Sequence, residues 1–158
     1  MKISILALLV ASVLSITAVG QKVQGVWALT EVTTTGTTGS TKQVSQPSLY
    51  IFTKTHYSIM YVSSDAPRPQ IADASKATAD QLRDVYVTSF VANAGTYEVK
   101  GGKLTMRPAV AKNPGFMQPG AFSTVSVKSD ANTMTLVTES TNAGPVSNPT
   151  TFKLKRVE

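Results

Sequence analysis

The chain has few side chains that could carry out acid–base or nucleophilic chemistry. His56 is the only histidine among 158 residues, and there is no cysteine. These counts do not supply the ligands of a structural zinc site. A base at His56 would need a carboxylate and a nucleophile beside it, and the sequence has no Gly-x-Ser-x-Gly elbow. We therefore expect His56 to be a strand or hairpin-edge residue, and we expect no metal or other cofactor.

Side chains of the kind that line ligand pockets are present on one segment. In a strand over residues 56–63, Tyr57 and Tyr61 would lie on one face and Met60 on the other. Each face of a strand there would be partly apolar, so either face could line a cavity. A tyrosine would offer an aromatic wall with a hydrogen-bonding tip, although ordinary core packing uses the same residues.

Two charged residues and one loop could complete a binding site. Glu31 falls on the same strand face as Trp27 and Leu29, which would direct it inward as a ligand anchor or an acid. The alternative is that the strand has reached solvent by that position. Arg107 could hold an anionic ligand or be a charge at the rim. The loop 112–120, which contains prolines and glycines, could be a lid or a wide turn.

Most of the chain consists of short β-forming segments separated by turn residues. The clearest turn is Gly101-Gly102, where both residues tolerate a positive φ in a two-residue hairpin. A second hairpin would turn at Lys54-Thr55. The eight predicted strands are 24–34, 47–53, 56–63, 95–100, 103–108, 121–128, 133–139 and 150–157.

One segment has helical spacing instead. Apolar residues separated by three or four positions there are Leu82, Val85, Tyr86 and Phe90. Thr78 followed by Gln81 forms a capping-box pattern, so we predict a helix near 79–91. Its apolar stripe would pack on the core, or Tyr86 would contact a ligand.

Eight sequential strands with short links can remove their edges by closing into a barrel. The sequence therefore predicts an all-β protein, an eight-stranded antiparallel up-and-down barrel with one inserted helix. A barrel of eight strands has room for one small ligand. Residues 21–158 suffice for a single domain of this kind.

The first twenty residues have the layout of a secretory signal peptide. Lys2 precedes an apolar run to Val19, and Ala18-Val19-Gly20 places small residues before a cleavage point at Gln21. We expect residues 1–20 to be removed and the protein to be secreted or periplasmic; an uncleaved anchor is the alternative. After cleavage we expect no membrane span.

The net charge of +6 comes from basic residues that are scattered along the chain and do not form a cluster. We therefore expect no nucleic-acid partner.

Gly25-Val26-Trp27 resembles the Gly-x-Trp opening of the lipocalins, and more closely that of bacterial lipocalin-like domain proteins. The resemblance continues through 47–53, 56–60 and 95–105, and departs from the family at the Lys54-Thr55 turn. It implies that Trp27 closes one end of a barrel beneath a basic residue of the last strand. Arg156 has the matching position, and its guanidinium would stabilise that closure by about 0.5–2 kcal/mol.

The resemblance and the lack of a nucleophile predict a barrel that binds a small, largely apolar ligand. An isomerase or hydrolase using His56 or Glu31 with a pocket tyrosine is one alternative. A structural or inhibitory module acting through its surface is another, and it would have a filled barrel and an exposed apolar patch. The sequence predicts no oligomeric state.

Overall fold

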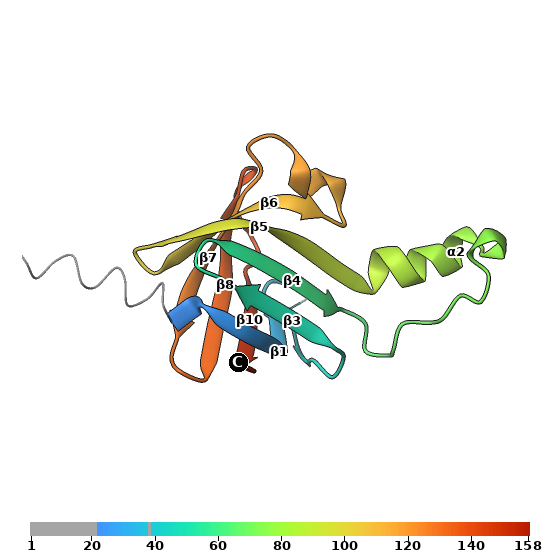
Figure 1. Ribbon diagram of the computed structural model, residues 1–158, viewed down its shortest axis with the longest axis horizontal. Helices are drawn as coiled ribbons and strands as arrows, with labels where there is room; N and C mark the ends of the chain where they lie inside the picture. Colours follow the sequence, from blue (N-terminus) through green and yellow to red (C-terminus); the bar gives the residue numbers. More distant parts are fainter. Residues whose placement is uncertain (1–21, 38) are drawn as a thin grey trace, which may run out of the picture.

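The computed structural model describes residues 22–37 and 39–158, so the predicted signal peptide lies outside the described residues. The described chain is a closed antiparallel barrel of eight strands (Figure 1), which confirms the predicted fold class. The last strand closes the barrel by pairing with both β8 and β1. The barrel strands are β1 (Gly25–Thr34), β3 (Ser48–Phe52), β4 (His56–Val62), β5 (Phe90–Lys100), β6 (Lys103–Ala111), β7 (Ser123–Ser129), β8 (Thr133–Thr141) and β10 (Thr150–Arg156).

Two short strands were not predicted. β2 (Ser40–Gln43) pairs with the second half of β1, while β3 pairs with its first three residues. β1 is longer than β3, so β2 covers the part of β1 that β3 does not reach. β9 (Gly144–Pro145) pairs with the end of β8.

Both predicted hairpins are present. Gly101 and Gly102 have φ of +59° and +74°, and they join Lys100 to its partner Lys103. At the other turn, the Thr53 amide donates to the His56 carbonyl at 2.9 Å, which places Phe52 opposite Tyr57 without a glycine.

The predicted helix exists but is shorter than expected. It comprises α2 (Ala79–Leu82) and a wider π-helical segment, η2 (Arg83–Thr88), and its capping box joins Thr78 and Gln81. The Ser89 hydroxyl donates to the Asp84 carbonyl at 2.5 Å, and β5 begins at the next residue. The described ranges also contain two 3-10 helices, η1 (Ala74–Lys76) and η3 (Pro114–Met117).

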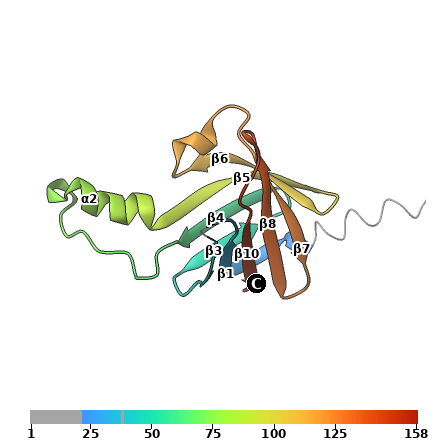
Figure 2. The ribbon, with the colours of Figure 1, turned by 180° about the vertical axis from the view of Figure 1, so that it is seen from behind.

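Residues 63–89 form an arm that projects from the side of the barrel (Figures 1 and 2). Arg68 fastens its returning loop, because Nε and Nη2 donate to the Val85 carbonyl at 3.1 and 2.8 Å. Lys112 of the β6–β7 loop donates to the carbonyls of Val87 and Phe90. Across the described ranges, no helix combines the length and the apolar character needed to cross a membrane.

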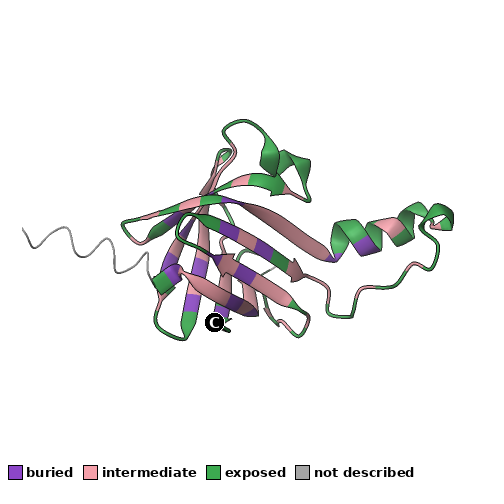
Figure 3. Cartoon of the chain, in the orientation of Figure 1, coloured by how far each residue is buried: buried purple, intermediate pink, exposed green. Residues whose placement is uncertain are grey.

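The core fills one half of the barrel. Alternate residues of the strands point inward, as the banding of buried and partly exposed positions shows (Figure 3). The side chains that are least exposed to solvent are Trp27, Leu104, Met134, Leu136 and Val23. Trp27 and its neighbours close this end of the barrel.

Candidate functional site

Trp27 and Arg156 form the closed end of the barrel. The Arg156 Cζ atom lies 3.9 Å from the centroid of the Trp27 ring, and Trp27 itself is fully buried. The indole Nε1 donates to the Val23 carbonyl at 2.9 Å. Arg156 also donates Nη1 to the Gln24 carbonyl at 2.9 Å and Nε to the Ala131 carbonyl at 2.5 Å. The guanidinium therefore joins the N-terminal segment, the β7–β8 turn and the last strand over one aromatic ring.

Steric constraints explain why the first residue of the Gly-x-Trp motif is a glycine. Gly25 has φ of +133°, and a Cβ atom built there would lie 2.1 Å from Arg156 Nη1. A side chain at residue 25 would displace the guanidinium that covers Trp27. Glycine permits both the backbone conformation and the close approach.

A cavity of about 240 Å³ lies in the other half of the barrel. The residues of its wall include some with polar side chains, among them Tyr50, Tyr61, Asn93, Ser123 and Thr138, and no charged residue of the described chain lines it. The apolar part of the wall includes Ile59, Val91, Met106, Val125, Leu136, Val146 and Phe152. The arrangement can enclose a small molecule and offers hydroxyl and amide groups to it.

Two tyrosines stand side by side in this wall. The rings of Tyr50 and Tyr61 are stacked, with centroids 6.1 Å apart and an interplanar angle of 17°. Burial raises the pKa of both hydroxyls above the ordinary value, and for Tyr50 the neighbouring Tyr61 adds to the effect. Both hydroxyls therefore stay protonated at neutral pH and can donate hydrogen bonds.

The structure determines which face of β4 points inward. Tyr57, Ile59 and Tyr61 face the interior, whereas Met60 lies on the outer face and is 40% exposed. Of the predicted ligand contacts on this strand, only Tyr61 lines the cavity. Sequence reasoning missed Tyr50, although its position opposite Ile59 in the β3–β4 hairpin was a usable signal.

Tyr57 lies deeper, in the filled half of the barrel. Its ring is 3% exposed, and its hydroxyl has no hydrogen-bond partner among the residues described. Burial raises the pKa of Tyr57 to about 12. Burial of this hydroxyl without a hydrogen bond makes the folded state less stable, because the hydroxyl loses its hydration and gains no partner.

Replacement of Tyr57 by phenylalanine is expected to leave the protein as stable as before or more stable, by up to about 1 kcal/mol. The ring packing is retained while an unpaired buried hydroxyl is removed. Tyr97→Phe is the matched control, because the Tyr97 hydroxyl donates to the Thr53 carbonyl at 2.5 Å and its loss should destabilise by about 1 kcal/mol. Urea unfolding measures both, and a destabilised Tyr57→Phe would contradict this reading.

A β-bulge determines the position of Glu31. The register of β1 against β10 shifts between Leu29 and Glu31, so Glu31 lies opposite Lys153 and not on the face of Trp27 and Leu29. Its carboxylate accepts from Lys153 Nζ at 2.8 Å and from Gln43 Nε2 at 2.7 Å. The hydrogen bond from Lys153 is the main cause that lowers the pKa of Glu31. Glu31 does not line the cavity.

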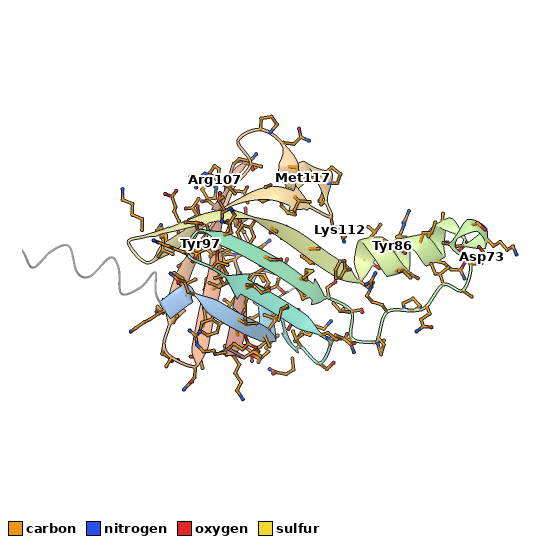
Figure 4. All side chains as sticks on the ribbon, in the orientation of Figure 1. Asp73, Tyr86, Tyr97, Arg107, Lys112 and Met117 are labelled. Atoms are coloured by element: carbon orange, nitrogen blue, oxygen red, sulfur yellow. The ribbon has the colours of Figure 1, made fainter. Side chains whose placement is uncertain are left out.

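The other predicted site residues also lie outside the cavity wall. Arg107 is on the outer face of β6, where Nη1 pairs with Glu98 at 2.9 Å. Tyr86 lies on the arm and is 55% exposed (Figure 4). His56 is exposed at the start of β4, and its Nδ1 atom is 2.8 Å from the Thr55 hydroxyl. The catalytic alternative required His56 or Glu31 to meet a pocket tyrosine, and neither residue lines the cavity.

The loop 112–120 reaches the cavity. η3 lies within it, and the Phe116 ring contributes to the cavity wall while remaining 48% exposed. Phe116 also borders a groove of about 600 Å³ between the loop and the arm, together with Tyr86, Val87 and Lys112. Figure 4 labels Tyr86 on the arm and Lys112 near it. A segment that lies at the mouth is compatible with the predicted lid.

No family model and no curated protein matches the chain. A lipocalin-like protein from Bacteroides uniformis ATCC 8492 is similar at 17% sequence identity and a TM-score of 0.47, covering 85% of this chain and 98% of its own. The strand order and the pairing of β10 with both β8 and β1 make the described chain a closed antiparallel up-and-down barrel.

Proposed function

We propose that the protein is an exported barrel that binds one small, largely apolar ligand in its interior without chemical change. The observation that carries the proposal is the cavity of about 240 Å³, which is lined mainly by apolar side chains of the barrel strands. Dry apolar cavities of about 150 Å³ hold a molecule the size of benzene, and drug-sized ligands need roughly 300 Å³ or more. The expected ligand is therefore of intermediate size, with one or two rings or a short chain.

The composition of the wall supports a largely apolar ligand. Phe152, Leu136, Met106 and Ile59 come from four different strands and face the same space. Removing apolar surface from water contributes about 25 cal/mol per Å² of area, so contact with these side chains would supply most of the affinity. The hydroxyls in the wall would orient the ligand.

Export is the second part of the proposal, and the predicted signal peptide supports it. N-terminal sequencing of protein recovered from the extracytoplasmic fraction should begin at Gln21. Protein that keeps Met1 and stays inside the cell would contradict export without affecting ligand binding.

Titration with N-phenyl-1-naphthylamine, a neutral apolar fluorophore, tests binding. We expect saturable binding with one site per chain. Ser123→Phe should weaken it at least about tenfold, because Ser123 lines the cavity and a phenyl ring there would occupy the space of the ligand.

Ser126→Phe is the matched control, because Ser126 lies on the same strand between the inward Val125 and Val127 and thus faces outward. Its affinity should equal that of the unmodified protein. Absence of saturable binding to the unmodified protein, or equal affinity in Ser123→Phe, would refute the proposed function.

A further inference from the structure

We infer that the cavity selects an uncharged ligand with one hydrogen-bond acceptor, such as a carbonyl oxygen. The hydroxyls of Tyr50 and Tyr61 would donate to this acceptor. This inference rests on the proposed function and specifies the chemical class of its ligand. It follows from two separate properties of the wall: its charge, and the state of its hydroxyl groups.

The first property is the lack of charge. Among the described residues, those that line the cavity include no Asp, Glu, Lys or Arg. The two charged residues that the sequence offered as anchors are engaged elsewhere, Arg107 with Glu98 at 2.9 Å and Glu31 with Lys153 at 2.8 Å. An anionic or cationic ligand would lose its hydration in the barrel and find no counter-charge there.

The second property is a pair of hydroxyls without partners. Tyr50 is 3% exposed, and burial is the main cause that raises the pKa of its hydroxyl. For Tyr61, burial is the only cause. Neither hydroxyl donates to an acceptor within the described ranges of the chain. Unlike the Tyr57 hydroxyl, neither of them is fully enclosed without a partner, so each is open to a molecule in the cavity and can donate to an acceptor that the ligand supplies.

The neighbouring polar group is less available. Thr138 Oγ1 already accepts from the Thr150 amide at 2.7 Å. A phenol hydroxyl donates readily, and stacking holds the two tyrosine rings together in one wall. The tyrosine pair therefore offers two phenol hydroxyls that can orient a ligand, in a wall that also contains the polar side chains of Asn93 and Ser123.

Two comparisons test the inference on the purified protein at physiological salt. The first compares N-phenyl-1-naphthylamine with 8-anilino-1-naphthalenesulfonate, which differs by an added sulfonate. We expect the anion to compete for the cavity at least about tenfold more weakly. Equal or better competition by the sulfonate would overturn the selection against charge.

The second comparison uses 6-propionyl-2-(dimethylamino)naphthalene, which carries a carbonyl and fluoresces at longer wavelength when that carbonyl accepts a hydrogen bond. The double variant Tyr50→Phe/Tyr61→Phe should bind it about 2- to 10-fold more weakly, with the bound emission shifted to shorter wavelength. Its affinity for N-phenyl-1-naphthylamine should change less than about twofold. Tyr86→Phe, on the arm, should alter neither.

The possible failures can be told apart. If neither neutral fluorophore binds the unmodified protein saturably, the proposed function itself fails. If both bind and the double variant keeps the affinity and emission of the carbonyl probe, the inference fails and the proposed function stands. Thermal unfolding of the double variant checks that the barrel is intact, which the retained rings favour.

Discussion

Trp27→Ala is expected to lower the free energy of unfolding by about 3–5 kcal/mol, the range for removing a buried aromatic side chain. Trp27 is fully buried, and its ring supports the Arg156 guanidinium at 3.9 Å. The variant would leave a cavity at the closed end and deprive the Val23 carbonyl of its indole donor. Small domains are stable by only about 5–15 kcal/mol, so this is a large fraction of the total.

Urea unfolding followed by circular dichroism measures the loss, because Trp27 is the only tryptophan and its fluorescence disappears with it. Tyr86→Ala removes another large side chain, 55% exposed on the arm, and should change stability by no more than about 0.5 kcal/mol. If Trp27→Ala does not fold, Trp27→Phe keeps part of the packing and should still lose about 1–3 kcal/mol. A loss below about 1 kcal/mol for Trp27→Ala would show that the plug is not needed for closure.

The barrel was predictable because its signals are local. Alternating apolar residues and turn glycines, such as Gly101 and Gly102, mark strands and hairpins one at a time, and sequential hairpins leave few ways to close. Thr78 and Gln81 likewise marked the helix start. The helix end was placed too late because Phe90 continues the helical spacing, although it is the first residue of β5.

The site was less predictable because it depends on register and irregularity. Glu31 continues the alternation of Trp27 and Leu29 in sequence, but the bulge after Leu29 changes its partner to Lys153. Nothing in the order of residues marks that bulge. The choice between Tyr61 and Met60 as inward residues also required the pairing of β4 with its neighbours, because both faces have apolar content.

The position of the cavity does have a compositional basis. Inward positions at the closed end carry large side chains, such as Trp27, Phe52 and Met134. At the open end, the cavity wall includes small hydroxyl residues, such as Ser123 and Thr138. The small residues leave space between the large side chains of the same wall, such as Tyr50 and Phe152, which the large residues at the closed end do not. The same chain therefore closes one end and leaves space at the other.

Gly95→Ala is expected to destabilise the protein by about 3 kcal/mol, at the upper end of the range for overpacking. Gly95 lies at a bulge between β5 and β6, where it pairs with Pro108. A Cβ atom there would lie 2.0 Å from the Arg107 carbonyl oxygen and 2.8 Å from the Ala109 nitrogen. These are backbone atoms, so the two strands would have to separate. Pro108 is tolerated within β6 because it lies at this bulge, where its nitrogen need not donate a hydrogen bond.

The displacement would also reach the ligand site, because Pro108 lines the cavity. We therefore expect Gly95→Ala to weaken binding of N-phenyl-1-naphthylamine as well as to lower stability, under conditions where the variant is still folded.

Two control variants separate the effect of the close backbone contact from the general effect of adding a methyl group. Gly115→Ala, where the nearest contact is the Asn113 side chain at 3.2 Å, should change stability by about 0.5 kcal/mol or less. Gly102→Ala, at φ of +74° with open space around it, should lose only the roughly 1–2 kcal/mol of a left-handed backbone. If Gly95→Ala were no worse than Gly102→Ala, close approach of β5 and β6 at this bulge would not be what shapes the cavity wall.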